Sequence, residues 1–176
     1  MKNNDILQRF LFDGTDIRGE ITTLESSYQN IVSRQNYPPA VAQLFGEFIA
    51  AASLLSATLK FPGIISIQAR GDGPLSTVMA ECTSGTKLRG IVRGDLQAAE
   101  NHASLQDLLG AGTLAITIEP EGGERYQGIV PMDAGSLSQC LEFYFQQSEQ
   151  LPTKIKLSAN DELAAGVLVQ QLPNHG

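Results

Sequence analysis

The segment from Phe61 to Asp95 constrains the fold of this chain more than any other stretch. Apolar and polar residues alternate along three parts of it, and two short runs rich in glycine, proline and small polar residues interrupt the alternation. Because successive side chains of a strand point to opposite faces of a sheet, this pattern predicts strands with one buried face. Glycine and proline favour turns and end strands. The segment is therefore predicted to form three consecutive antiparallel strands.

The hydrophobic pattern selects the register of these strands, because a slip of one residue moves every side chain to the other face. With Gly71 to Pro74 as the first loop, we predict that Arg70 faces Leu75 and that Ile65 lies opposite Ala80. A three-residue second loop, Ser84 to Thr86, keeps the arginines of the third strand off the apolar face. The apolar face then contains Ile65, Ile67, Ala69, Val78, Ala80, Leu88 and Val92, and the opposite, mixed face contains Ile64, Leu75, Met79, Arg89, Ile91 and Arg93.

A long helix is predicted from about Pro39 to Lys60. Its apolar residues recur at helical spacing, and no charged residue stands between Glu47 and Lys60. A helix that is apolar on most sides is expected to be sandwiched in the core. The alternative is an exposed contact in a dimer. Twelve uncharged residues are too few to span a membrane.

The remaining segments complete an α+β fold. A second amphipathic helix is predicted at Ser136 to Ser148, where Ser136 and Gln139 form a capping box. Shorter helices are predicted after a capping box at Ser26 and Gln29 and after a cap at Ser104. Three further strand pairs are predicted, at 6–12 with 17–24, 113–119 with 125–130, and 153–158 with 165–172. We expect mostly antiparallel sheets with one face packed against the long central helix, and residues 1–176 as a single domain.

Composition narrows the function classes. The chain has 12 basic and 19 acidic residues and a net charge of −7, which repels phosphate backbones, so no nucleic-acid partner is expected. The first residues lack the basic and then apolar layout of a signal peptide, and no apolar run is long enough for a membrane span. We therefore expect a cytoplasmic protein without a membrane partner.

The sequence offers little material for catalysis. Cys82 and Cys140 match no paired metal-ligand spacing, and His102 and His175 are the only histidines. Both cysteines are expected to remain reduced thiols, and we assign no catalytic residue, no metal site and no cofactor in this chain. A thiol-dependent enzyme that uses Cys82, next to a basic strand, is the alternative.

Four motifs together resemble one protein family. They are Gly71-Asp72-Gly73-Pro74, the strand with Arg89-Gly90 and Val92-Arg93-Gly94, the hairpin with Gly123-Glu124-Arg125-Tyr126-Gln127-Gly128, and Ser148-Glu149-Gln150-Leu151-Pro152. Their order and spacing resemble the redox-regulated heat shock protein 33 chaperones, also called the 33 kDa chaperonin family. The resemblance extends over nearly the whole chain.

The resemblance implies an ATP-independent holdase that binds partly unfolded client proteins under oxidative stress, and it implies homodimers. In that family a linker joins the N-terminal domain to a C-terminal module, which holds zinc through a C-x-C and a C-x-x-C pair and senses oxidation. This chain contains neither pair. We therefore expect it to be the substrate-holding N-terminal domain, with zinc bound only in a module absent from this chain.

The mixed face of the predicted sheet is the candidate client-binding surface. The resemblance implies that a linker normally covers this face, and uncovered apolar area favours binding of unfolded segments. The candidate residues are Ile64, Leu75, Met79, Ile91, Arg89 and Arg93. A further alternative is an interaction domain whose apolar sheet face makes only a homodimer.

Overall fold

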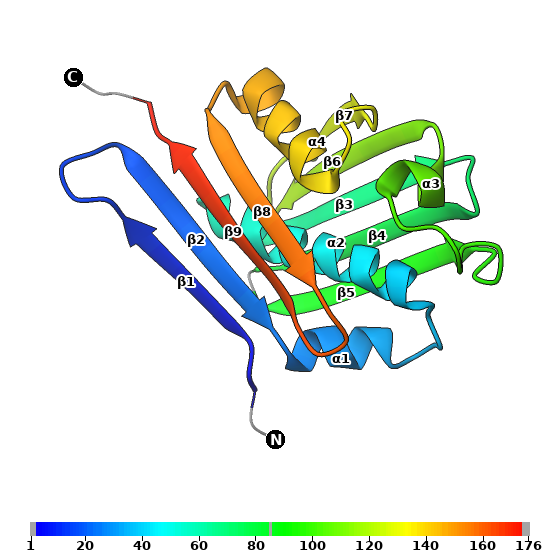
Figure 1. Ribbon diagram of the computed structural model, residues 1–176. Coiled ribbons are helices and arrows are strands. Elements are labelled where there is room, and N and C mark those ends of the chain that lie inside the picture. The colour runs from blue at the N-terminus through cyan, green and yellow to red at the C-terminus, as the bar shows by residue number, and fades with distance from the viewer. Residues whose placement is uncertain (1–2, 85, 174–176) are drawn as a thin grey trace.

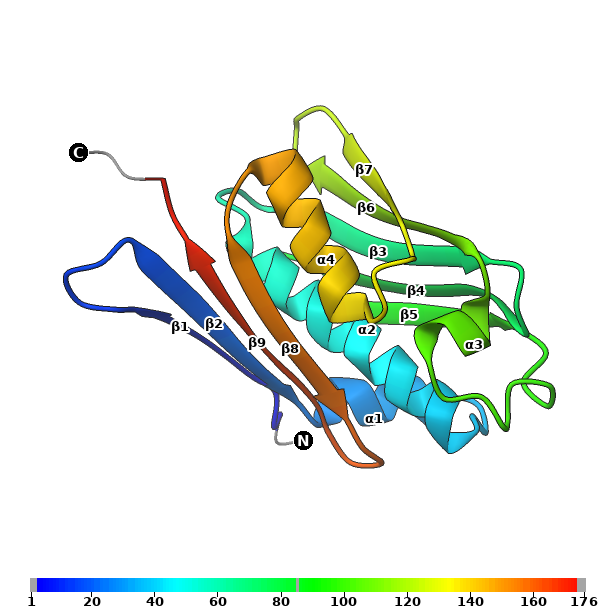
Figure 2. The ribbon, with the colours of Figure 1, turned by 45° about the horizontal axis from the view of Figure 1, so that its top comes forward.

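Two antiparallel sheets enclose one long helix, as Figures 1 and 2 show. The computed structural model describes residues 3–84 and 86–173. The described elements are β1 (Ile6–Leu11), β2 (Ile17–Leu24), α1 (Ser26–Val32), α2 (Pro39–Thr58), β3 (Gly63–Gly71), β4 (Leu75–Thr83), β5 (Lys87–Gly94), α3 (Leu105–Leu109), β6 (Gly112–Pro120), β7 (Tyr126–Pro131), α4 (Leu137–Tyr144) with a π-helical extension (Phe145–Glu149), β8 (Thr153–Ala159) and β9 (Ala164–Gln171). The predicted α+β class is confirmed.

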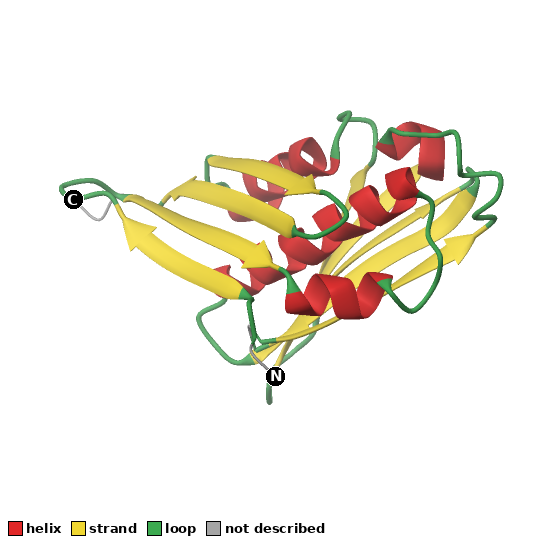
Figure 3. Cartoon of the chain, turned by 60° about the horizontal axis from the view of Figure 1, so that its bottom comes forward, coloured by secondary structure: helices red, strands yellow, loops and turns green. Residues whose placement is uncertain are grey.

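The strands form a four-stranded sheet, in the order β1-β2-β9-β8, and a five-stranded sheet, in the order β5-β4-β3-β6-β7. The three predicted central strands are β3, β4 and β5, and the hairpin of β6 and β7 extends their sheet through antiparallel pairing of β6 with β3. The four-stranded sheet combines strands from the N-terminal and C-terminal parts of the chain, because β2 pairs with β9. Figure 3 shows this sheet as a separate layer beside the helices.

Helix α2 lies between the two sheets and is buried along most of its length. Phe48, Ile49 and Leu54 are completely buried, and the hydroxyl oxygens of Ser53 and Thr22 in β2 lie 2.9 Å apart in a hydrogen bond. The predicted core role of this helix is confirmed. Among the described residues α2 is the one helix long and apolar enough to cross a membrane, and 78% of its most apolar stretch is buried inside this fold.

The pairing of the central strands corrects one prediction and confirms another. Ile65 pairs with Cys82, not with Ala80, so the predicted register between the first two strands is wrong by two residues. The loop between them is longer than predicted because the end of α3 engages it: the Gly73 N–H donates to the Leu109 carbonyl group at 2.9 Å. A shift of two residues keeps every side chain on its predicted face.

The second turn has the predicted length, since Thr83 pairs with Lys87. Gly85, in the middle of that turn, lies outside the described residues. Ile67, Val78 and Ala80 are buried against α2, as the predicted apolar face requires.

Helix termini follow local signals at α3 and α4 but not at α1. Ser104 caps α3, and Ser136 with Gln139 forms the predicted capping box of α4. The capping box predicted at Ser26 is wrong, because helix α1 already includes Ser26. The Asp5 carboxylate instead accepts hydrogen bonds from the backbone N–H groups of Glu25 and Ser27. A residue before β1 therefore performs the capping role.

Candidate functional site

Each sheet has one outward face, because α2 covers only the inward faces. We name the outward side of the five-stranded sheet the five-strand face; it is the mixed face selected from the sequence. Strand register aligns one row across it, from Ile91 through Met79, Gln68 and Ala115 to Ile129. Ile91 and Ile129 are exposed and Met79 is half-buried. The row places apolar side chains at both edges of the sheet.

Charged side chains flank this row. The Arg89 guanidinium group lies 2.7 Å from the Glu81 carboxylate across β4 and β5. Arg93 and Arg70 are exposed on the other side of the row, and Ile64 is half-buried in β3. The five-strand face is thus a narrow apolar row between cationic and polar groups.

Leu75 does not belong to this face, although the sequence pattern placed it there. The register shifts between Leu75 and Thr77 where β4 pairs with β5, as in a β-bulge. A bulge inserts one residue and so reverses the alternation of side chains beyond it. Leu75 consequently points inward and is completely buried. The structure removes it from the candidate client surface and brings the other five residues together on one face.

Ile129 and Ala115 complete the row and were missed by the sequence reasoning. Both lie in a hairpin that the sequence predicted correctly, at outward positions of β6 and β7. The alternation of that hairpin identifies them as outward residues. Their alignment with Met79 and Ile91 depends on the pairing of β6 with β3, which the local pattern does not specify.

The outward side of the four-stranded sheet is a second candidate surface, which we name the four-strand face. Within residues 3–84 and 86–173, its central strands β2 and β9 present no charged side chain outward, and the outward charges are Lys154 and Lys156 on the edge strand β8. Its apolar side chains are exposed or half-buried: Ile6, Phe10, Ile17, Ile21, Val167 and Val169. No described helix lies over this face.

Local packing builds the four-strand face. Phe10 of β1 pairs with Gly19 of β2, and a Cβ atom at Gly19 would collide with the Phe10 ring. The glycine therefore lets the ring pack directly on β2. The Phe10 and Phe12 rings make an edge-to-face contact, with centroids 5.5 Å apart. Edge-to-face contact is a favoured arrangement of two aromatic rings.

The thiols offer no accessible nucleophile in this fold. Cys82 is completely buried on the inward face of β4, and Cys140 is completely buried in α4. Burial raises the pKa of the Cys140 thiol. Burial blocks substrate access to Cys82, so the fold gives no support to a thiol-dependent enzyme. Across residues 3–84 and 86–173, no group of three or more His, Cys, Asp and Glu side chains is placed to hold a metal ion.

Comparisons with known proteins give a consistent assignment. The family model described as Hsp33 protein matches residues 5–176. The 33 kDa chaperonin of Ectopseudomonas mendocina (strain ymp) is 53% identical over 172 residues, which are 98% of this chain and 58% of that protein. The 33 kDa chaperonin of Shewanella frigidimarina (strain NCIMB 400) is 54% identical over 173 residues, which are 97% of this chain and 59% of that protein.

A solved structure supports the fold. The crystal structure of the 33 kDa chaperonin (heat shock protein 33 homolog) from Thermotoga maritima superposes with a TM-score of 0.83 at 21% sequence identity, over 94% of this chain and 60% of that chain. The present chain spans about three fifths of the length of these proteins. Because the family model matches residues 5–176 and relatives more than half identical align throughout, this chain belongs to the Hsp33 family.

Proposed function

We propose that this chain is the client-holding domain of an ATP-independent chaperone and works in the cytoplasm. Membership of a family whose relatives are named 33 kDa chaperonins supports the chaperone class. A holdase needs exposed apolar surface, because burying a client's apolar area stabilises the complex by about 25 cal/mol per Å². It does not need a catalytic constellation.

The exposed apolar surface of the four-strand face is the observation that carries the proposal. Ile6 and Ile21 are 52% and 41% exposed on a sheet surface whose two central strands present no outward charge. Contiguous apolar surface of this kind marks interaction sites in folded proteins. An unfolded client offers hydrophobic side chains in many orders, and an open apolar surface accepts them without a specific sequence.

The five-strand face is the second client surface in this proposal. Ile64, Met79, Ile91, Arg89 and Arg93 supply a narrower apolar row with cations on both sides, and Ile129 extends it. Cations beside apolar groups suit acidic client segments, since opposite charges steer association. We assign the larger share of client affinity to the four-strand face, because its apolar groups are not interrupted by charge.

Redox control is a further part of the proposal. The relatives are longer than this chain, and family resemblance implies a zinc-binding switch module joined through a linker that covers client surface in the reduced state. We propose that in such a protein the cover lies on an outward sheet face. The 176-residue chain is then expected to hold clients under both reducing and oxidising conditions.

Light scattering from an aggregating client tests the proposal. The chain should suppress aggregation at stoichiometric amounts without ATP, in reducing and in oxidising buffer alike. Val167→Asp places a charge at the centre of the four-strand face and should weaken suppression, whereas Met79→Asp is the matched variant on the other sheet and should weaken it less. Lack of suppression in both buffers, by a chain shown to be folded by circular dichroism, contradicts the proposal.

We also propose that the chain forms a homodimer, as the family resemblance implies. An apolar sheet face is also a suitable surface for a second copy of the chain. Sedimentation velocity over a range of concentrations tests this: a dimer gives a concentration-dependent sedimentation coefficient, and a constant monomer value contradicts it. A dimer that forms through the four-strand face would compete with clients, so client addition should then shift it towards monomer.

A further inference from the structure

A cavity of about 560 Å³ lies where the end of α2 meets the hairpin of β1 and β2. Its wall brings together two guanidinium groups, one ammonium group and one carboxyl group, although the chain as a whole is acidic. We propose that this cavity binds an oxyanion, a carboxylate or a tetrahedral oxyanion such as phosphate or sulfate, between Arg9 and Arg18. This site lies on the inward side of the four-stranded sheet and is distinct from both outward faces.

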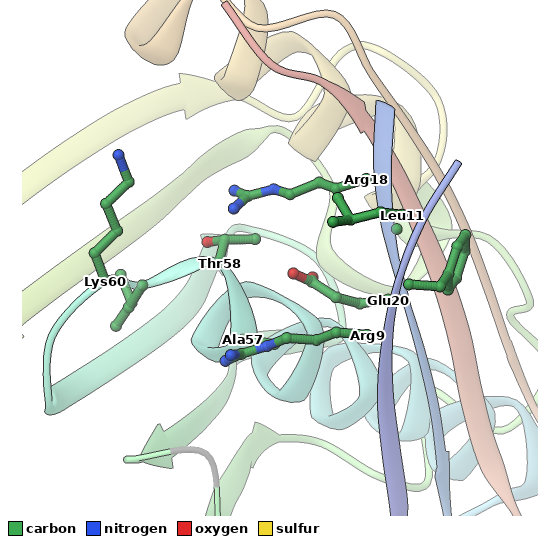
Figure 4. A pocket seen from close by; sticks show the side chains of 10 residues that line it. Arg9, Leu11, Arg18, Glu20, Ala57, Thr58 and Lys60 are labelled. Atoms are coloured by element: carbon green, nitrogen blue, oxygen red, sulfur yellow. The ribbon is translucent and has the colours of Figure 1, made fainter. Parts of the chain in front are cut away.

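Strand register explains why these side chains meet. Arg9 of β1 is the direct cross-strand partner of Glu20 of β2, and Arg18 lies two residues before Glu20 on the same face. Figure 4 shows the three side chains extending from the two strands towards the end of α2, with Thr58 and Lys60 on the other side. Helix α2 ends at Thr58, so it does not cover this end of the sheet.

Two of the polar atoms in this cluster have no hydrogen-bond partner in the part of the chain that the structure describes. Arg18 Nε and Glu20 Oε2 are buried, and neither makes a hydrogen bond to any described residue. Glu20 is 1% exposed, yet neither Arg9 nor Arg18 lies within ion-pair distance of it among the described residues. Buried polar groups in folded proteins are nearly always hydrogen-bonded. An orphaned donor and an orphaned carboxyl oxygen at one cavity wall therefore point to a bound group that satisfies them.

The chemistry of that group follows from the donors. Arg18 Nη2 already donates to Gln170 Oε1 at 2.8 Å, which fixes the guanidinium group and leaves Nε available. Guanidinium groups prefer planar or tetrahedral oxyanions, and two of them with a nearby lysine outweigh one carboxylate. The arginines do not cap the carbonyl end of α2, because among the described residues no hydrogen bond joins either side chain to a carbonyl group of that helix, and Arg18 donates to Gln170 instead.

The protonation state of Glu20 is expected to influence anion binding at this site. Burial raises the pKa of its carboxyl group to about 7, although the charges of Arg18 and Arg9 act to lower it. The groups that face it are Arg9 from β1, Arg18 from β2 and Lys60 after α2, while β9 presents the neutral Leu168 and Gln170. A protonated Glu20 can donate a hydrogen bond to an oxyanion, whereas an ionised Glu20 repels it. Anion affinity is therefore expected to rise as the pH falls.

Nuclear magnetic resonance on the 176-residue chain tests this site. Sulfate, which keeps its charge between pH 6 and 8, is the first probe, and acetate is the second. The side-chain N–H resonance of Arg18 and the backbone amide of Gly19 should shift and saturate. Affinity should be about tenfold higher at pH 6 than at pH 8, because the competent protonated fraction of Glu20 changes by about that factor. The tighter of the two probes identifies the ligand as tetrahedral or planar.

Variants make the test decisive. Glu20→Gln should keep sulfate binding and lose its pH dependence, and Arg9→Gln, at an exposed position, should weaken binding several-fold without unfolding the chain. Arg18→Gln should weaken it further, with the Gly19 amide as reporter. Lys156→Gln removes an exposed positive charge on β8 and should change nothing. Shifts that grow linearly with both probes, or equal loss in Lys156→Gln and Arg9→Gln, overturn the proposal.

Discussion

The outward faces of the two sheets differ in how charge is distributed over them. Both sheets pack their inward faces against α2, so their folding roles are alike. On the five-strand face Arg70, Arg89 and Arg93 flank the apolar row, and Glu81 pairs with Arg89. The outward charges of the four-strand face, among the described residues, lie on the edge strand β8. Charge on a sheet surface protects against unspecific association, and the surface without it is the better candidate for binding.

The strands of the two sheets also differ in their sequence patterns. The central strands show clear alternation, and their mixed face carries both apolar and charged residues. In β9 the apolar residues occupy inward and outward positions alike, as Leu168, Val167 and Val169 show. A strand of that kind resembles a fully buried one in sequence. Exposure of its outward side becomes visible only when the neighbouring layers are placed.

The largest expected effect tests which side chains belong to the five-strand face. Leu75→Ala should lower the free energy of unfolding by about 3 kcal/mol, because it leaves a cavity in the core. Met79→Ala, two strand positions beyond the bulge and half-buried, should cost less than about 1 kcal/mol. Urea unfolding followed by circular dichroism measures both. Equal losses of unfolding free energy in the two variants would indicate that Leu75 lies on the outward face.

The next effect compares the two faces as client surfaces. Ile21→Asp should weaken binding of a fluorescently labelled unfolded client by about tenfold or more, since burying an isoleucine side chain contributes about 1.5–3 kcal/mol. Ile91→Asp, with 37% exposure on the five-strand face, should weaken it by less than about threefold. Fluorescence anisotropy gives both affinities. A larger loss in Ile91→Asp would reverse the assignment of the main client surface.

A smaller effect concerns the ionisable group beneath the four-strand face. The raised pKa of Glu20 means that the folded state holds its proton to higher pH than the unfolded state. The contribution of this proton to the free energy of unfolding is fully present below the pKa that Glu20 has in the unfolded chain. It is lost as the pH rises through about 7, the pKa in the folded state. Thermal unfolding of Glu20→Gln should therefore show a weaker decline in stability between pH 5.5 and pH 8, by on the order of 1 kcal/mol.

Glu47 in α2 provides the comparison for that measurement. Burial raises the pKa of its carboxyl group to about 7 as well, so it keeps its own share of the slope in Glu20→Gln. The double variant with Glu47→Gln should flatten the profile further. A slope unchanged by either substitution would show that neither carboxyl group titrates abnormally.

The smallest expected effect is at the ion pair of the five-strand face. Arg89→Gln should change the free energy of unfolding by less than about 1 kcal/mol, because the Arg89 side chain is 75% exposed and such pairs contribute little. Client affinity should also change little, since the main client surface lies on the other sheet. Arg93→Gln, which breaks no ion pair within the described residues, serves as the control. A clear loss of client binding in Arg89→Gln alone would show that the five-strand face contributes more to client affinity than proposed.

Much of the fold could be predicted because the relevant patterns are local. The apolar stripe of α2, the caps at Ser104 and Ser136, and the alternation of β3 and β6 depend on neighbouring residues only. The register of β3 against β4 could not be predicted, because a slip of two residues leaves the hydrophobic pattern unchanged. The inward position of Leu75 depends on a bulge, and the cap at α1 comes from Asp5, a residue distant in sequence.

The candidate sites divide in the same way. The sequence by itself determined five of the six side chains proposed for the five-strand face, because strand periodicity assigns each residue to one face. It also determined the burial of α2 and of Cys140. Only the tertiary structure decided that β2 lies beside β9, which creates the four-strand face and brings Arg18 to Gln170. Periodicity specifies which face of an element is buried, whereas its neighbours depend on long-range packing that no local pattern encodes.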